Sequence, residues 1–126
     1  MTNDKRRPVF LDLTRIHLPI TAVLSITHRL TGILLFLLIP PLVYMFDLSL
    51  SNQQGYDRVA SVFDRWGARL LFILLLWGFT HHLLAGIRYL LIDIDIGVGR
   101  ESSRITAWCV IAGGIIVLFS SALLLL

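Results

Sequence analysis

The sequence predicts an all-α membrane protein with three transmembrane helices. Three apolar stretches, at residues 20–46, 70–92 and 105–126, are each long enough to cross a bilayer, which takes about 20 residues. The chain is 56% hydrophobic and only 15% charged, with a mean hydropathy of +0.81. These values are too apolar for a soluble domain of 126 residues and favour a small polytopic membrane protein. The stretches are expected to be helices, because a single segment in lipid must satisfy its own backbone hydrogen bonds.

Prolines mark the first stretch. Pro19 lies where a first helical turn would begin, which suits its fixed φ and its missing N–H. Pro40 and Pro41 interrupt the apolar run and are predicted to bend the helix near its outer end. The polar loop that follows is expected to form an interfacial helix in its second half, carrying Phe63 and Trp66.

The third stretch contains small residues at its centre. Gly113 and Gly114 would let another helix approach closely. Cys109 is the only cysteine of the chain, so no disulfide or cysteine-rich metal site can form within it. We expect Cys109 to be a small buried hydrophobe. The three spans take up more than half of the sequence and leave no room for a separate soluble or nucleotide-binding domain.

Positive charge is concentrated on one side of the predicted spans. Seven cations precede the first span or lie around the link between the second and third: Lys5, Arg6, Arg7, Arg15, Arg88, Arg100 and Arg104. The opposite loop has three arginines balanced by three aspartates. The positive-inside rule therefore predicts a cytoplasmic N-terminus and a periplasmic C-terminus. The polar N-terminal segment resembles neither a cleaved signal nor a transit peptide, which favours a multi-pass protein of a bacterial inner membrane. The sequence has no basic stripe interleaved with aromatic residues, so nothing in it indicates a nucleic-acid partner.

Two histidines near the centre of the second span indicate a functional site, because an ionisable group at that depth is costly without a partner. Gly78 and Gly86 lie four residues before and after His82, so the three share one helix face. A flat macrocycle could lie against this smooth strip with its iron on His82. His81 is the weaker candidate, because Trp77 obstructs its face, and we expect it to be a hydrogen-bonded neutral imidazole. The alternative for His82 is a role in helix contact or proton relay.

A polar cluster lies near the inner end of the first span. Ser25 and Arg29 are four residues apart and share a face, with His28 beside them. Arg29 lies about 15 Å into the span. This cluster could hold a haem propionate or a quinone carbonyl, because the planar guanidinium suits carboxylates. Snorkelling to the interface is the alternative for Arg29. Arg88 could likewise meet a propionate, pair with Asp93 or Asp95, or anchor the helix at the membrane surface.

Two segments carry a resemblance to a known family. The first contains, in order, Arg7-Pro8, Leu13, Ile20, Ser25, His28-Arg29 and Thr31, and the second contains His82, Gly86-Ile87-Arg88 and Asp93. Together, at this separation, they resemble the signatures of the cytochrome b membrane-anchor subunit of succinate dehydrogenase. Tyr89 departs from the usual His or Phe, and Ile92 departs from the usual aromatic residue, which leaves the role of position 89 open. The likeness covers about the first three quarters of the chain and includes the three-span architecture.

The resemblance implies a heteromeric helix bundle that shares one haem b between this chain and a second hydrophobic anchor subunit. His82 would be the axial ligand from this chain, with His28, Arg29 and Arg88 toward the propionates. Ser25 and Arg29 would bind ubiquinone. A flavoprotein subunit and an iron–sulfur subunit would complete a succinate:ubiquinone oxidoreductase, and this chain would have no catalytic activity alone. Two alternatives stay open: an anchor of a quinol:fumarate reductase, and a haem-free membrane scaffold or transporter subunit.

Overall fold

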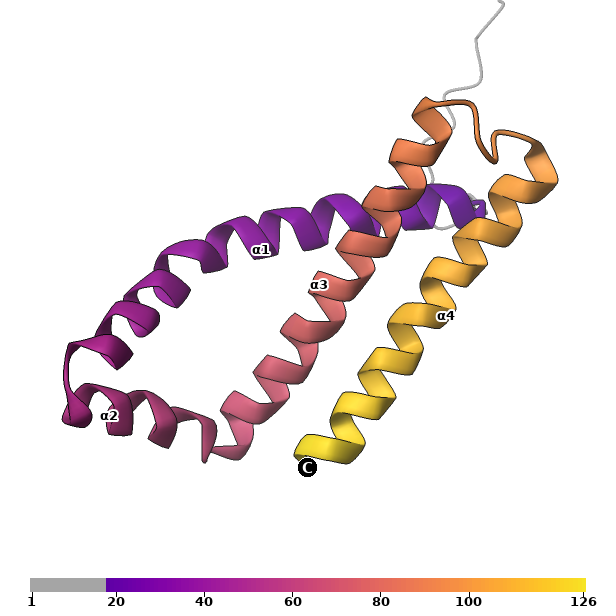
Figure 1. Cartoon of the computed structure of the whole chain (residues 1–126). Helices are drawn as coiled ribbons and strands as arrows, with labels where there is room; N and C mark the ends of the chain where they lie inside the picture. The colour runs from indigo at the N-terminus through magenta and orange to yellow at the C-terminus, as the bar shows by residue number, and fades with distance from the viewer. Residues whose placement is uncertain (1–17) are drawn as a thin grey trace, which may run out of the picture.

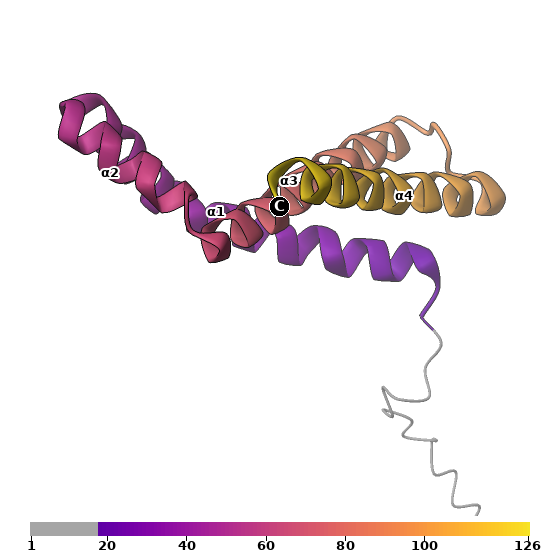
Figure 2. The same ribbon diagram turned by 90° about the horizontal axis from the view of Figure 1, so that it is seen from below.

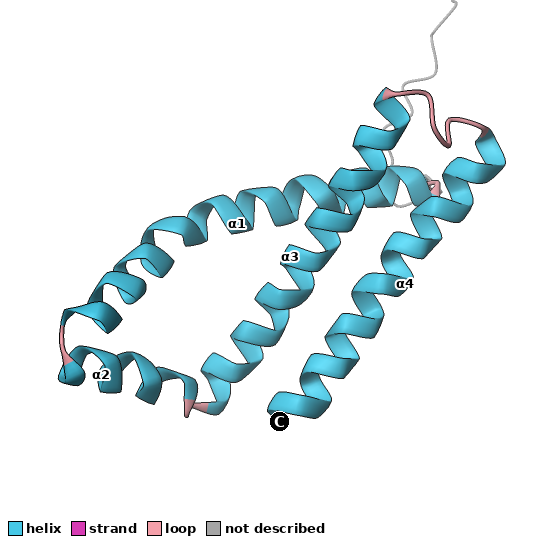
Figure 3. Ribbon diagram, in the orientation of Figure 1, coloured by secondary structure: helices cyan, strands magenta, loops and turns pink. Residues whose placement is uncertain are grey.

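The computed structural model describes residues 18–126, which form four helices joined by short links (Figures 1 and 3). Their bounds are α1 (Ile20–Ser51), α2 (Gln53–Phe63), α3 (Trp66–Asp93) and α4 (Arg100–Leu125). Three of them, α1, α3 and α4, are long and apolar enough to cross a membrane. The prediction of an all-α protein with three such helices is confirmed. Each helix extends beyond at least one end of its predicted apolar range, because helical hydrogen bonding continues into the polar flanks.

Helix α1 begins and bends at its prolines. Pro19 immediately precedes the helix, and its carbonyl oxygen accepts hydrogen bonds from the amides of Ala22 at 2.9 Å and Val23 at 3.2 Å. Pro40 and Pro41 both lie inside the helix, where neither has an N–H to donate to the preceding turn. The helix is continuous through them and curves toward α2 in its second half (Figure 1).

A tight turn connects α1 to the short helix α2. The side chain of Asn52 caps α2 by accepting a hydrogen bond from the amide of Gly55 at 2.8 Å. A Cβ atom at Gly55 would collide with the backbone oxygen of Leu48, so this reversal requires glycine. A helix is therefore present in this loop as predicted, but it begins earlier than expected and ends at Phe63, whereas Trp66 belongs to α3.

Helices α3 and α4 form an antiparallel pair, and the first half of α1 packs across them (Figures 1 and 2). Close approach depends on the two predicted glycines of α4. A Cβ atom at Gly113 would lie 2.8 Å from Leu84 Cδ1, and one at Gly114 would lie 3.2 Å from Trp77 Nε1. The buried core lies where α1 and α4 begin and consists of Leu24, Ala85, Ala107 and Val110, flanked by Ile20, Leu84, Tyr89 and Ile111.

Many large apolar side chains are exposed among residues 18–126. In the second half of α1, Phe36 is 71% exposed and Phe46 is 65% exposed. The expectation that Cys109 is buried is wrong, since it lies exposed on α4. Side chains of this kind on membrane-crossing helices face lipid or another subunit, because lipid removes the penalty that water would impose.

Candidate functional site

The imidazole of His82 points from α3 toward the backbone of α1. Its Nδ1 atom lies 3.1 Å from the carbonyl oxygen of His28 and 3.4 Å from the hydroxyl oxygen of Thr31. A carbonyl oxygen can only accept, so Nδ1 carries the proton and donates it. The other nitrogen, Nε2, then keeps its lone pair, and it has no hydrogen-bond partner within residues 18–126. This tautomer is the one that a histidine needs to bind a metal through Nε2.

Gly32 makes this contact possible. A Cβ atom at Gly32 would lie 2.9 Å from Cε1 and 3.4 Å from Nδ1 of His82. The bare backbone at this position lets the imidazole reach the carbonyl of His28, one turn earlier on α1. Sequence reasoning missed Gly32. The signal available was its spacing of four residues from His28, which places both on one helix face.

The predicted strip of Gly78, His82 and Gly86 is covered by α1. A Cβ atom at Gly78 would lie 3.8 Å from Thr31 Cγ2, and one at Gly86 would lie 3.6 Å from His28 Nε2. The three residues do share a face, but that face packs against another helix of the same chain. Small residues allow two helix backbones to approach closely, so the strip that was predicted to receive a flat ligand is instead the contact surface for α1.

Three aromatic rings follow one another between α1 and α3. The ring of His28 stacks on His82 with centroids 4.2 Å apart and planes at 9°. The ring of Tyr89 lies on from His28, at 5.2 Å and 55°. The hydroxyl of Tyr89 is buried and has no hydrogen-bond partner in the described part of the chain. A buried hydroxyl without a partner costs about 1–3 kcal/mol, so the Tyr89 hydroxyl is a candidate donor to a group outside residues 18–126.

Ser25 and Arg29 also have side-chain donors without a hydrogen-bond partner within residues 18–126. Most serines and threonines of these helices donate back to the preceding turn. Thr31, for example, donates to the carbonyl oxygen of Thr27 at 2.9 Å. No such bond involves the half-buried hydroxyl of Ser25 or the exposed guanidinium of Arg29 among the described residues. The helix holds the two at a spacing of four residues, so both donors are available to one ligand.

Arg88 is engaged by α4. The side chain is 6% exposed, and its Nε donates to Thr106 Oγ1 at 3.0 Å. Its Nη2 donates to both oxygens of Ser103, at 2.9 Å and 2.7 Å. Of the predicted site residues, the structure therefore brings His28 and His82 together and directs much of the Arg88 guanidinium to the other side of α3. The sequence signal that could have indicated these Arg88 contacts is the pair of hydroxyls at Ser103 and Thr106, three residues apart on α4.

His81 is buried and hydrogen-bonded. It is 3% exposed, and its Nε2 lies 2.9 Å from the hydroxyl oxygen of Thr27. Trp77 stacks against it with centroids 5.5 Å apart. The expectation of a hydrogen-bonded His81 obstructed by Trp77 is confirmed. Within residues 18–126, no group of three or more His, Cys, Asp or Glu side chains could hold a bare metal ion.

Comparison with known proteins gives a consistent picture. The model of the succinate dehydrogenase/fumarate reductase transmembrane subunit family matches residues 3–121. A succinate dehydrogenase cytochrome b556 subunit from Coxiella burnetii is 33% identical over 108 residues, 85% of this chain and 86% of that protein. One from Rickettsia prowazekii is 32% identical over 112 residues, 89% and 87% of the two chains. One from Paracoccus denitrificans is 26% identical over 115 residues, 91% and 88%.

Proposed function

The chain belongs to the succinate dehydrogenase/fumarate reductase transmembrane subunit family, and from that premise we propose that its His82 ligates haem b and its Ser25 and Arg29 bind ubiquinone. As an anchor subunit of succinate dehydrogenase it is part of a multisubunit enzyme in a membrane. The cytochrome b556 name of its relatives implies haem b. The assignment of these roles to individual residues, and of ubiquinone as the bound quinone, is our proposal.

One observation carries the haem assignment: His82 donates from Nδ1 to a backbone carbonyl and leaves Nε2 free. Histidines that bind metals nearly always donate their other ring nitrogen in this way, which fixes the ring orientation and raises the basicity of the ligand. Gly32 forms the matching gap in α1. The residues present therefore fit a haem held by one axial imidazole from this chain, with a second ligand from the other hydrophobic subunit. A haem ligated in this manner exchanges single electrons.

The haem propionates have several donors to meet on this side of the site. His28 is stacked on His82, and Arg29 follows it directly in the chain. Tyr89 offers a buried hydroxyl that lacks a partner within residues 18–126. Arg88 would contribute through the part of its guanidinium that α4 does not occupy. Burial of carboxylates near such donors is favourable because the hydrogen bonds are charge-assisted.

Ubiquinone binding is assigned to Ser25 and Arg29. Their hydroxyl and guanidinium lie on one face of α1 without hydrogen bonds to other described residues. Donors aimed at a quinone oxygen stabilise the negative charge that develops on reduction. The role of this chain is to hold and orient the quinone head, while the electrons arrive from other subunits.

The remaining partners are proposed to be a flavoprotein subunit, an iron–sulfur subunit and a second hydrophobic anchor. The exposed apolar side chains of α1 supply a surface on which a second anchor can pack. The excess of cations on one side favours a cytoplasmic N-terminus and a periplasmic C-terminus in a bacterial inner membrane. Protease treatment of inside-out vesicles would test this orientation, since the N-terminal segment should be cut.

The proposed function is tested by the dithionite-reduced minus oxidised spectrum of the detergent-purified native assembly. A b-type signal is expected, together with succinate-dependent reduction of ubiquinone. An assembly that lacks haem would refute the ligand assignment and leave a haem-free anchor or scaffold.

Substitution of Gly32 by alanine is expected to weaken haem binding. The new Cβ atom would lie 2.9 Å from Cε1 of His82, which is closer than real side chains approach, so the imidazole must shift away from the His28 carbonyl. Haem content per assembly should fall several-fold, with a shifted spectrum. Gly67→Ala is the matched control, because a Cβ atom at Gly67 meets nothing within 4 Å. Equal haem content in both variants would contradict the role of Gly32.

A further inference from the structure

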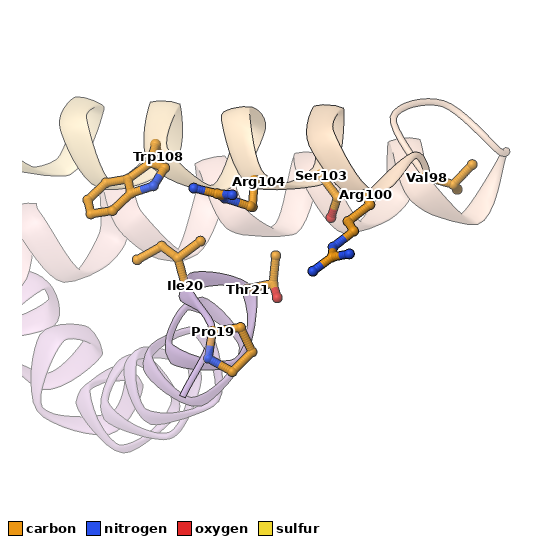
Figure 4. Close-up of a pocket in the computed structure, with 8 residues that line it drawn as sticks. All are labelled: Pro19, Ile20, Thr21, Val98, Arg100, Ser103, Arg104 and Trp108. Carbon is orange, nitrogen blue, oxygen red and sulfur yellow. The ribbon is translucent and has the colours of Figure 1, made fainter. Parts of the chain in front are cut away.

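We propose that Arg100 and Arg104 bind the phosphodiester group of an anionic phospholipid in a cavity between the start of α1 and the start of α4. The cavity has a volume of about 590 Å³. Figure 4 shows Arg100, Arg104 and Trp108 on one wall, facing Ile20 and Thr21 of α1. This proposal rests only on the chain lying in a membrane and is independent of the haem and quinone assignments.

The two arginines and the tryptophan form one stripe along α4. Arg100, Arg104 and Trp108 are spaced four residues apart, so they lie on the same helix face. All three also line a second cavity of about 560 Å³ on the other flank of the stripe. That second cavity includes Glu101, whose carboxylate would repel an anion. Among the described residues, the lining of the first cavity includes no acidic side chain, so of the two cavities it is the one suited to a phosphate.

The guanidinium groups of Arg100 and Arg104 have no polar partner within residues 18–126. Neither Arg100 nor Arg104 makes a hydrogen bond or ion pair with another residue in the described range, and both are exposed. Arg88, by contrast, is occupied by hydroxyl and carbonyl oxygens of α4. A guanidinium presents several donors in a plane and binds phosphate oxygens in pairs. Two free groups one turn apart can therefore hold one phosphodiester.

The order of the stripe matches the layers of a membrane surface. The apolar run of α4 begins at Ile105, so the arginines lie at the boundary and Trp108 lies about 6 Å deeper than Arg104. Tryptophan prefers this depth because its ring is apolar and its indole N–H is polar. Ile20 and Val98 add apolar walls to the cavity. A free phosphate ion would gain nothing from them, whereas the glycerol and acyl carbons of a lipid would.

Native mass spectrometry of the purified assembly, stripped of lipid and titrated with phosphatidylglycerol, tests the proposal. Arg100→Gln combined with Arg104→Gln is expected to weaken phosphatidylglycerol binding about tenfold or more. Arg58→Gln combined with Arg65→Gln removes the same charge from the link on the other side of the bundle and should leave binding unchanged. Phosphatidylcholine, which carries no net charge, should bind the native assembly more weakly and respond to neither pair.

Two further experiments distinguish a lipid phosphate from a free phosphate ion and keep the test informative if the glutamine variant misfolds. Inorganic phosphate should fail to displace phosphatidylglycerol, and displacement at equal concentration would mean an ion site only, which overturns the lipid. Arg100→Lys with Arg104→Lys keeps the charge but loses the paired geometry, so an intermediate loss is expected even if the glutamine variant does not assemble. Equal binding by native and lysine-substituted assemblies, or no lipid bound because another subunit fills the cavity, would refute the proposal.

Discussion

Substitution of His82 by alanine is expected to abolish the b-type haem signal of the assembly. His82 is the imidazole whose protonated Nδ1 is fixed by the carbonyl of His28 and whose Nε2 has no other partner in the described chain. Alanine removes the only ligand that this chain is proposed to offer, so the haem would lose the imidazole nitrogen that His82 would supply. The reduced-minus-oxidised spectrum and extracted haem per assembly measure the loss.

The neighbouring histidine provides the control. His81→Gln can keep a hydrogen bond to Thr27, which lies 2.9 Å from Nε2 of His81, and should retain the haem signal. In a His82→Gly variant, added imidazole should restore part of the signal, because the free ring replaces the missing side chain. An unchanged spectrum in His82→Ala, or equal losses in the His81 and His82 variants, would refute the ligand assignment.

Ser25→Ala and Arg29→Ala are expected to lower ubiquinone reduction by about 10- to 100-fold, while oxidation of succinate with a soluble dye acceptor persists. A hydrogen bond to a charged group contributes about 1.5–3 kcal/mol, and each 1.36 kcal/mol changes a rate by about tenfold. The two activities separate because the dye takes electrons before they reach the membrane subunit. Parallel assays of both activities on the same membranes check the result.

Controls on matched residues make this test specific. Ser49→Ala removes a hydroxyl from the same helix that is already bonded to the carbonyl of Phe46 at 2.7 Å. Arg58→Ala removes an exposed arginine of α2. Both should reduce ubiquinone at the native rate. Equal loss of the two activities in the Ser25 or Arg29 variants would instead indicate failed assembly and would contradict a role in quinone binding.

The three membrane-crossing helices follow from the sequence because composition and span length are local properties. The shared faces of Ser25 with Arg29, and of His82 with its glycines, follow equally well from helical periodicity. The sequence did not reveal which carbonyl of α1 lies opposite His82, because that depends on how two helices distant in the chain cross. For the same reason Gly32 was overlooked, and Arg88 was assigned without knowledge of Ser103. The buried state predicted for Cys109 failed because an apolar environment in a membrane does not require burial within the chain.

The bond between His82 and the backbone of α1 has a consequence for how this site tolerates mutation. Its acceptor is a main-chain carbonyl, which every amino acid carries, so no substitution at position 28 can delete it. The hydrogen bond that orients the proposed iron ligand therefore does not depend on the side chain at position 28, which leaves the His28 ring available for its stacking contact and for the propionate role proposed above. Vulnerability shifts to position 32, where any side chain at all would block the contact. Among the residues of this site, Gly32 is therefore expected to tolerate substitution least.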